Sequence, residues 1–175
     1  SVSDLKEYSS EFNFIVDEID AQEIEKIAIS STKIRNSINE GDLKTTKTYL
    51  GRFFSLTGKV VKGDGLGKQI NYPTANISIE EDYKIIPKDG VYYIKTTIDN
   101  KLYNGMMNIG HRPTIGTKEK SIEVNLFSFD KDIYDKVISV DVVEKIREEK
   151  KFSSIEALKT QLAKDEEHCL KLINK

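Results

Sequence analysis

Hydrophobic and polar residues alternate along the middle of the chain, and this two-residue period is typical of β-strands. Clusters of Gly, Pro, Asp and Asn, which favour turns, separate the alternating segments. Six segments show the pattern, and they lie at 54–61, 75–79, 91–98, 102–109, 122–129 and 137–144. An antiparallel barrel leaves no strand edge unpaired. The pattern therefore predicts a mainly β fold built on a six-stranded antiparallel barrel.

The C-terminal segment has a helical period instead. Ser153 and Glu156 have the spacing of a capping box. Apolar residues then recur every three or four positions, at Ile155, Leu158, Leu162, Cys169 and Leu172. We expect a C-terminal helix that packs on the barrel, with the single cysteine as a small apolar filler.

The first fifty residues lack the alternating pattern and are typical of α/β structure. Gly41 and Gly51 each follow a helical stretch and suit the left-handed position that ends a helix, while Asp42 can cap the helix between them. Because the chain begins with Ser inside a helical pattern, we expect residues 1–50 to be the end of a longer α/β module. Residues 51–175 would then form the barrel domain.

Charge and composition narrow the functional classes. The 27 Lys and Arg residues nearly balance the 29 Asp and Glu residues, so the net charge of −2 gives no basic field for nucleic acid or an anionic membrane. No apolar stretch approaches the roughly 20 residues that span a bilayer. One cysteine cannot form an internal disulfide, which fits a reducing compartment. We expect a cytoplasmic protein without nucleic-acid or membrane partners, and the sequence leaves its oligomeric state open.

A loop with alternating glycines follows the first predicted strand. Gly63, Gly65 and Gly67 would let successive backbone N–H groups converge on a phosphate. Loops between strands also use glycine for turn geometry alone. The loop by itself therefore leaves both interpretations open.

The segment 73–76, with the sequence Pro-Thr-Ala-Asn, adds a second requirement. Alternation along a strand places the Thr74 hydroxyl and the Asn76 amide on one face. Mg²⁺ prefers oxygen ligands and takes only one or two of them from the protein when nucleotide phosphates supply others. The two residues are candidate metal ligands, and a solvent-facing polar strand is the alternative.

Two charged residues farther along are candidates for phosphoryl-transfer chemistry. Glu123 lies off the hydrophobic face of its strand, where a carboxylate could accept an alcohol proton or simply face solvent. Arg112, in the loop after the fourth strand, offers a guanidinium for phosphate, although an exposed loop arginine is often only solvated. No metal-ligand spacing joins His111 to His168, so His111 is assigned no role.

Together these motifs resemble the flavokinase family. The resemblance rests on the glycine loop, Pro-Thr-Ala-Asn, a Gly-x-Arg-Pro-Thr turn at 110–114, the strand glutamate, and Asp-Ile-Tyr at 132–134, in that order. It implies transfer of the γ-phosphate of ATP to the 5′-hydroxyl of riboflavin, giving FMN and ADP. ATP would lie under the glycine loop, with Mg²⁺ at Thr74 and Asn76 and with Glu123 as the base.

The resemblance also bears on the flavin and on local loop shape. By analogy Arg147, Phe152 and Leu158 would lie near the flavin. Three positions depart from the common pattern, with Asn71 and Asp135 in place of Gly and Asn125 in place of His. Asn tolerates a positive φ better than most residues, so the turn at Asn71 can survive.

The N-terminal part resembles the end of the FMN adenylyltransferase module that is fused to flavokinase in bacterial bifunctional FAD synthetases. The marker is Ser30, Ser31, Thr32 and Arg35, which would hold a phosphate at the start of a helix, although an ordinary helix cap explains the serines equally well. The upstream histidine motif of that module is missing, and fifty residues cannot build its core. The parent protein would also make FAD, whereas adenylyl transfer by this chain is not expected.

Two other classes remain as alternatives. A non-catalytic flavin- or nucleotide-binding barrel would use the same loops without turnover, and the presence of Glu123 argues against it. An oligonucleotide-binding barrel would normally show a basic groove with interleaved aromatic residues, which does not fit the net charge of −2.

Overall fold

The computed structural model describes residues 1–18, 23–24, 27–63, 65–111 and 120–173. The chain forms two compact units, Ser1–Ser30 and Ser31–Lys175, which are described separately. Among the described residues, no helix combines the length and apolar character needed to cross a membrane.

The first unit contains one helix and a short hairpin. Helix α1 (Val2–Phe12) starts with a capping box between Ser1 and Asp4 and ends at Asn13 in the left-handed conformation. Strands β1 (Glu23–Ile24) and β2 (Ile27–Ala28) pair in antiparallel fashion.

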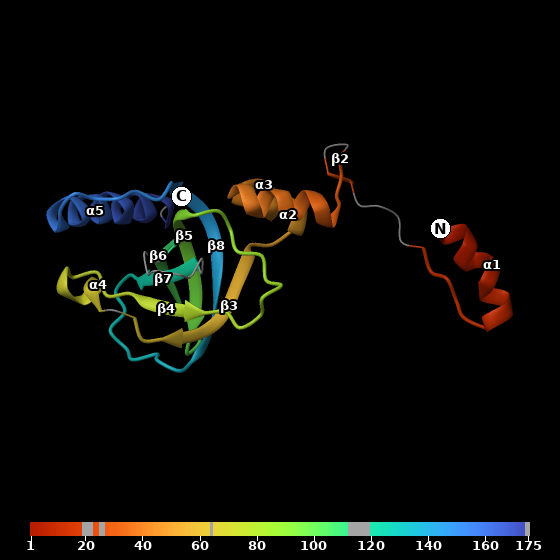
Figure 1. Ribbon diagram of the computed structural model, residues 1–175, viewed down its shortest axis with the longest axis horizontal. Helices are drawn as coiled ribbons and strands as arrows, with labels where there is room; N and C mark the ends of the chain where they lie inside the picture. The colour runs from red at the N-terminus through yellow and green to blue at the C-terminus, as the bar shows by residue number, and fades with distance from the viewer. Residues whose placement is uncertain (19–22, 25–26, 64, 112–119, 174–175) are drawn as a thin grey trace. The chain divides into compact units, whose positions relative to one another are not determined.

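The second unit is a closed barrel of six antiparallel strands (Figure 1). The strands are β3 (Phe54–Val61), β4 (Ala75–Ser78), β5 (Gly90–Ile98), β6 (Lys101–His111), β7 (Lys120–Leu126) and β8 (Val137–Arg147). They follow one another around the barrel in the order β3-β4-β7-β6-β5-β8. The predicted six-stranded barrel is confirmed, and each strand begins within two residues of its expected start.

Alternate residues of the strands fill the barrel interior with branched and aromatic side chains, as expected for a small barrel. Leu56, Tyr92, Ile94, Met107 and Val140 are among the fully buried members of this core. Gly58 permits a close approach between β3 and β4, because a Cβ there would lie 2.4 Å from the carbonyl oxygen of Ser78.

Strand β5 breaks the alternation, since both of its faces are buried. Tyr92 and Ile94 point into the barrel core, while Val91 and Tyr93 belong to a second cluster with Met106 and Cys169. Helix α5 (Ile155–Ile173) covers this outer face, and its contacts are with β6 and β8. The expected packing of the C-terminal helix on the barrel is confirmed, with Cys169 as an apolar filler.

The start of α5 corrects two details of the sequence prediction. Helix α5 begins at Ile155, so Ser154 and not Ser153 is its cap, and the Ser154 hydroxyl accepts a hydrogen bond from the Ala157 amide at 3.1 Å. The predicted capping box between Ser153 and Glu156 is therefore one residue out of register. Ile155 is half exposed because it lies in the first turn, beyond the covered stripe.

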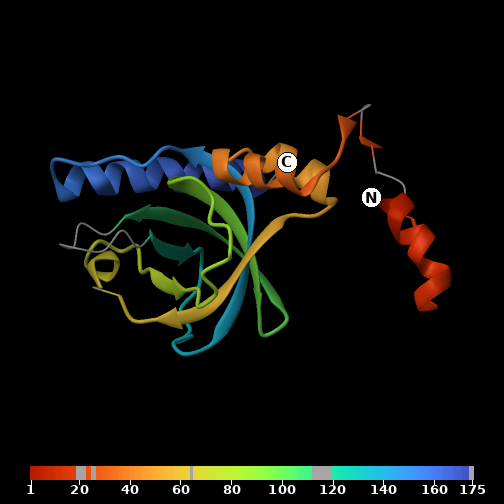
Figure 2. The same ribbon diagram turned by 45° about the vertical axis from the view of Figure 1, so that its right-hand side comes forward.

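Helices α2 (Ser31–Glu40) and α3 (Leu43–Leu50) belong to the same unit as the barrel. Gly41 and Gly51 have φ values of +77° and +68°, and Asp42 accepts a hydrogen bond from the Thr45 amide, as the sequence predicts. Leu43 is buried in the barrel core. Helices α3 and α5 lie on the same side of the barrel in Figures 1 and 2. The compact unit thus begins at Ser31, and the division at residue 50 stays a prediction about family origin.

Candidate active site

The central polar residues lie on the outer face of the barrel, on β4 and β7. The antiparallel register places Asn76 of β4 opposite Glu123 of β7, and Glu123 is in turn opposite Asn108 of β6. Thr74, just before β4, directs its hydroxyl to Glu123 Oε2 at 3.4 Å. Three residues that the sequence singled out separately are therefore brought together.

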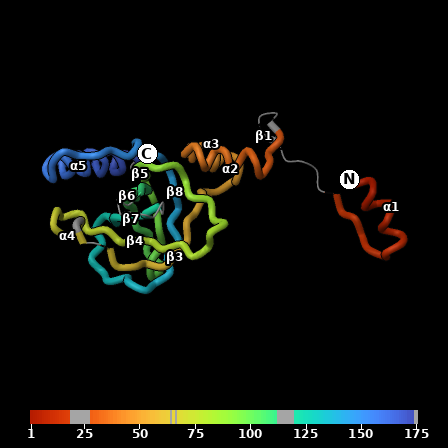
Figure 3. Tube along the Cα trace, in the orientation of Figure 1, coloured from red at the N-terminus to blue at the C-terminus, as the bar shows by residue number. Residues whose placement is uncertain are grey.

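The three glycines of the loop after β3 are needed for three different reasons. A Cβ at Gly63 would lie 1.9 Å from Asn76 Nδ2, and a Cβ at Gly67 would lie 2.2 Å from the carbonyl oxygen of Tyr72. Gly65 has open space around it but a φ of +73°. The loop contains a single helical turn, α4 (Leu66–Gln69), which the sequence analysis did not predict and which the Cα trace in Figure 3 shows between β3 and β4.

The departures from the family pattern are accommodated locally. Asn71 and Asp135, which replace Gly, both have a φ of +63°, the left-handed region that Asn and Asp enter more readily than most residues. Asp135 also pairs with Lys59 at 2.8 Å. Asn125 donates a hydrogen bond from Nδ2 to the Pro73 carbonyl at 2.7 Å and so supports the segment that leads to Thr74.

A first cavity of about 220 Å³, here called cavity A, lies beside Glu123. Six residues that the sequence analysis proposed for the site line it, and they are Gly67, Thr74, Glu123, Arg147, Phe152 and Leu158. Its wall is largely apolar or aromatic on the side of α5 and polar at Glu123 and Asn108. The three residues that the resemblance assigned to the flavin thus share one cavity with the proposed base.

A second cavity of about 600 Å³, cavity B, lies on the other side of Thr74. Lys68 and Lys131 line it together with Asp130 and Asp132, so its charged side chains balance, and Tyr134 adds an aromatic ring. The Asp132 carboxylate accepts a hydrogen bond from the Tyr134 amide at 2.9 Å, which fixes the turn at 132–134. Thr74 lines both cavities. The residue that the two linings share is therefore one that contacts Glu123.

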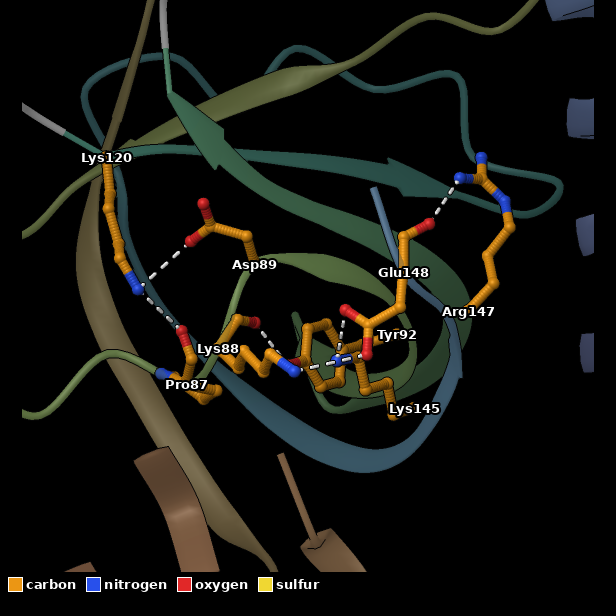
Figure 4. Close-up of polar contacts among 8 residues, drawn as sticks. All are labelled: Pro87, Lys88, Asp89, Tyr92, Lys120, Lys145, Arg147 and Glu148. Atoms are coloured by element: carbon orange, nitrogen blue, oxygen red, sulfur yellow. Dashed lines mark hydrogen bonds and ion pairs between the residues drawn. The ribbon is translucent and has the colours of Figure 1, made fainter. Parts of the chain in front are cut away.

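Arg147 is held from two sides. Its Nε lies 2.9 Å and 3.1 Å from the two carboxylate oxygens of Asp165, and Nη2 lies 2.8 Å from Asp165 Oδ2. Its Nη1 donates to the Glu148 carbonyl at 2.9 Å, as Figure 4 shows. The guanidinium carbon lies 5.7 Å from the centre of the Phe152 ring. The side chain is thus fixed at the wall of cavity A.

The sequence analysis missed Tyr72, which lines cavity A, and Asp165, which lies behind its wall and contacts Arg147. Asp165 is 2% exposed and lies between Leu162 and Cys169 on the apolar stripe of α5. A charged residue inside an apolar stripe was the signal that could have found it. Tyr72 also lines cavity A, and its hydroxyl donates to Glu166 at 3.2 Å. Burial and the neighbouring Glu166 raise the pKa of the Tyr72 phenol, which stays protonated at neutral pH.

A polar network at the start of β5 connects this strand to the end of β6 and the start of β7 (Figure 4). Asp89 lies 2.7 Å from His111 Nδ1 and 3.1 Å from Lys120 Nζ, and Lys120 also donates to the Pro87 carbonyl at 2.9 Å. The contact gives His111 a structural partner. Arg112, the predicted phosphate ligand, lies outside the described residues.

The residues of the N-terminal marker stand apart from both cavities. Ser31 and Thr32 open α2, as predicted, and Ser30 precedes it. The side chains of Ser30, Ser31, Thr32 and Arg35 are all exposed. None of the four lines cavity A or cavity B as the described residues form them.

Comparisons with known proteins point in one direction. A family model described as "Flavokinase: Riboflavin kinase" matches residues 50–173. A Bacillus subtilis relative described as a bifunctional riboflavin kinase/FMN adenylyltransferase is 38% identical over 146 residues, which are 82% of this chain and 46% of that protein. A Haemophilus influenzae relative with the same description is 37% identical over 93% of this chain and 53% of its own length. The chain therefore spans about half the length of the curated relatives it matches.

Solved structures agree on the fold. The crystal structure of riboflavin kinase from Trypanosoma brucei has a TM-score of 0.50 and 25% identity, covering 69% of this chain and 80% of that one. A Streptococcus pneumoniae structure described as a macrolide-efflux protein has a TM-score of 0.83 and 37% identity, covering 95% of this chain and 54% of its own. The latter description is a statement about that protein alone.

Proposed function

Because the chain belongs to the riboflavin kinase (flavokinase) family, we propose that it phosphorylates the 5′-hydroxyl of riboflavin with ATP where cavities A and B meet. The observation that carries this proposal is the place of Thr74, which lines both cavities and contacts Glu123. Two substrates that react with each other need two adjoining sites with a shared boundary. A group able to accept a proton has to stand at that boundary.

Cavity A is the better site for riboflavin. Tyr72, Phe152, Leu158 and Leu162 give it an aromatic and aliphatic wall, which suits a flat, largely apolar ring system. Arg147 adds N–H donors at the edge of this wall. Glu123 lies in the same cavity, where the ribityl hydroxyl could reach it.

Cavity B is the better site for ATP. It is the larger of the two, and Lys68 and Lys131 offer ammonium groups to phosphate in a lining that also includes Asp130 and Asp132. The glycine loop follows β3 in the chain and includes helix α4, which carries Lys68. Gly63, Gly65 and Gly67 belong to the same proposal as phosphate contacts, although they are not among the described residues that line cavity B. Arg112 belongs to it as well and lies outside the described residues.

Glu123 is proposed as the general base. Its carboxylate would take the proton of the 5′-hydroxyl while the hydroxyl oxygen forms a bond to the γ-phosphorus and the bond to ADP breaks. The contact with Thr74 and the pairing of β7 with β4 and β6 fix the position of Glu123. A carboxylate on a rigid strand keeps its orientation without reorganisation.

Thr74 and Asn76 are proposed as the protein ligands of Mg²⁺. Their neutral oxygens suit a cation that also binds phosphate oxygens, and bound Mg²⁺ would neutralise charge on the phosphates. The close approach of Gly63 to Asn76 leaves the loop backbone beside this amide. No group of three or more His, Cys, Asp or Glu side chains is arranged as a metal site in the described part of the chain. Metal binding would therefore depend on the nucleotide.

We further propose that the whole protein also has FMN adenylyltransferase activity and that this chain alone does not. The relatives are named for both activities, and this chain covers about half of them. Ser30, Ser31, Thr32 and Arg35 would be the part of that second site present here. FAD formed from FMN and ATP by the chain alone would disprove the second statement.

The decisive experiment is conversion of riboflavin to FMN by the purified chain, followed by chromatography, with ATP and with or without Mg²⁺. We expect FMN and ADP in equal amounts only when both ATP and Mg²⁺ are present. Binding of riboflavin without any FMN would favour the alternative, a non-catalytic flavin-binding barrel. A change of Glu123 to Gln then separates binding from turnover.

A further inference from the structure

One carboxylate of α5 is buried without lying in the reaction site. Asp165 is 2% exposed and is surrounded on its helix by the apolar residues that pack on the barrel. A buried carboxylate is costly to desolvate unless a charge and hydrogen bonds compensate it. Here Arg147 supplies the charge, and Gln161 Nε2 donates to Asp165 Oδ1 at 2.8 Å. The buried position of Asp165 therefore depends on its contact with Arg147.

The contact is two-pronged, and this matters for the direction of the guanidinium. Nε and Nη2 of Arg147 both approach the Asp165 carboxylate, so the plane of the guanidinium is set by a carboxylate and not by a single point charge. Nη1 is aligned by the Glu148 carbonyl. A guanidinium has five N–H bonds, and these contacts use three of them. The remaining N–H bonds are available to a ligand.

The fixed guanidinium of Arg147 also holds a neighbouring side chain, Phe152, in place. Arg147 ends β8, and the guanidinium carbon lies 5.7 Å from the centre of the Phe152 ring, within the range of a cation–π contact. Both side chains line cavity A. The loop that carries Phe152 is thereby linked through Arg147 to a helix residue that does not itself line the cavity.

We propose that Asp165 is a positioning residue for the flavin: it orients the Arg147 guanidinium, and with it Phe152, at the wall of cavity A. The proposal rests on the assignment of riboflavin to cavity A. It gives α5 a role in substrate affinity beyond covering the barrel. Loss of the Asp165 carboxylate would leave Arg147 free to turn away, so flavin binding would weaken while ATP binding would not.

The test measures riboflavin binding by quenching of flavin fluorescence, together with the KM for ATP, for the variants Asp165→Asn, Arg147→Met and their combination. We expect Asp165→Asn to raise the riboflavin Kd about 10- to 100-fold, the range seen when a residue that orients a binding group is removed. The KM for ATP should change less than about 3-fold, because neither Asp165 nor its partners Arg147 and Gln161 line cavity B. The double variant should bind riboflavin no worse than Arg147→Met alone.

Glu167→Gln is the matched control, since it removes a carboxylate from the same helix at an exposed position that pairs with Lys171. Gln161→Ala is a second probe that keeps both charges and removes only one hydrogen bond to Asp165. It decides the question if Asp165→Asn does not fold, and we expect a rise in the riboflavin Kd of about 3-fold, smaller than for Asp165→Asn because the ion pair with Arg147 remains.

Three results would overturn the positioning role. The first is an unchanged riboflavin Kd in folded Asp165→Asn or, if that variant does not fold, in Gln161→Ala. The second is an equal loss of affinity for ATP. The third is a double variant in which the losses of riboflavin affinity from the two single variants add. A wild-type chain that does not bind riboflavin would instead refute the assignment of cavity A. The two failures are thus distinguishable.

Discussion

Strands β4 and β5 lie opposite each other in the closed order of the barrel, and they differ in almost every respect. Strand β5 has nine residues and pairs with β6 along its whole length, from Gly90 to Ile98. Strand β4 has four residues, with three paired positions on β3 and two on β7. The strand that is least supported by pairing is the one that carries the polar residues of the candidate site.

The difference follows from what covers each strand. Helix α5 packs over the outer face of β5, so Val91 and Tyr93 are as buried as the interior residues Tyr92 and Ile94. The outer face of β4 and β7 instead lines cavities, and Asn76 and Glu123 occupy it. Stability thus comes mainly from the β5 side, and the β4 side is available for chemistry. Substitutions on each side can test this difference between the β4 side and the β5 side.

The largest effect is expected at Glu123. Glu123→Gln should lower kcat by a factor on the order of 10²–10⁴, the usual contribution of a positioned general base, because the amide cannot accept the hydroxyl proton. Binding of riboflavin and of ATP should change little. Steady-state kinetics and separate ligand titrations measure both.

The matched control for Glu123→Gln is Glu144→Gln, the same change at an exposed strand position of β8. It should leave kcat within about 2-fold, as is usual for a surface substitution. If folded Glu123→Gln turned over like the wild type, Glu123 would be a surface carboxylate and the β4 side would lose its assigned role.

The next effect concerns the covered face of β5. Burial, with a smaller contribution from Asp165, raises the pKa of the Cys169 thiol to about 12, from an ordinary value of 9.0. The thiolate is the reactive form, so a rise of three pKa units predicts alkylation at pH 8 slowed by about 1,000-fold relative to the unfolded chain. Mass spectrometry after iodoacetamide treatment, with and without urea, measures the ratio. Rapid alkylation of the folded chain would mean that α5 separates readily from β5.

A smaller effect is expected at Asn76. Asn76→Ala should weaken Mg²⁺-dependent ATP binding by about 10- to 100-fold, corresponding to the loss of one charge-assisted contact, and should leave riboflavin binding nearly unchanged. Ser78→Ala, two residues along the same strand and exposed, is the control. Equal losses for both ligands would show that Asn76 mainly supports the barrel.

The difference between the β5 side and the β4 side also explains which features could be predicted from sequence. The six strands follow from alternation, and the half of β5 that is buried on both faces is recognisable as the continuous apolar run at 91–94. The polar motifs on β4 and β7 predict that Thr74, Asn76 and Glu123 face the same way. Their meeting depends on the register between strands 47 residues apart in sequence, as Asn76 and Glu123 are, and no local pattern encodes it.

Other features depend on contacts between distant elements. Asp165 interrupts an apolar stripe, but its partner Arg147 is 18 residues away across a turn. Helix α4 is a single turn without a sequence period of its own. The inclusion of α3 with the barrel rests on one buried residue, Leu43, which nothing in its local sequence distinguishes from an ordinary helix residue.

Leu43 provides the fourth prediction. Leu43→Ala should lower the free energy of unfolding by about 2–5 kcal/mol, because it leaves a cavity in the core at the base of β3 and β8, and kcat should stay unchanged. Lys44→Ala, the next residue and exposed, should cost less than about 0.5 kcal/mol. Urea denaturation measures both. A chain that starts at Gly51 should lose at least as much stability as Leu43→Ala, whereas one that starts at Ser31 should lose little.

An unchanged stability of the chain that starts at Gly51 would be informative as well. If the chain from Gly51 were as stable as the chain from Ser31, then α2 and α3 would contribute nothing to the barrel. The division at residue 50 would then describe the folding unit as well as the family match at 50–173.

The smallest effect is expected in the glycine loop, on the β4 side, where two neighbouring glycines have different constraints. A Cβ at Gly65 meets no atom within 4 Å, so Gly65→Ala carries only the penalty of its φ of +73°, which is about 1 kcal/mol. A Cβ at Gly67 would lie 2.2 Å from the Tyr72 carbonyl oxygen, and a backbone atom cannot move without displacing the segment that leads to Thr74.

Gly65→Ala should therefore change the KM for ATP by less than about 5-fold, equivalent to that penalty, while Gly67→Ala should raise the KM for ATP further and lower kcat. Kinetics of both variants at saturating riboflavin measure the difference. Equal effects would mean that the loop is held by its backbone conformation alone, and the close contact between Gly67 and Tyr72 would have no part in aligning Thr74 with Glu123.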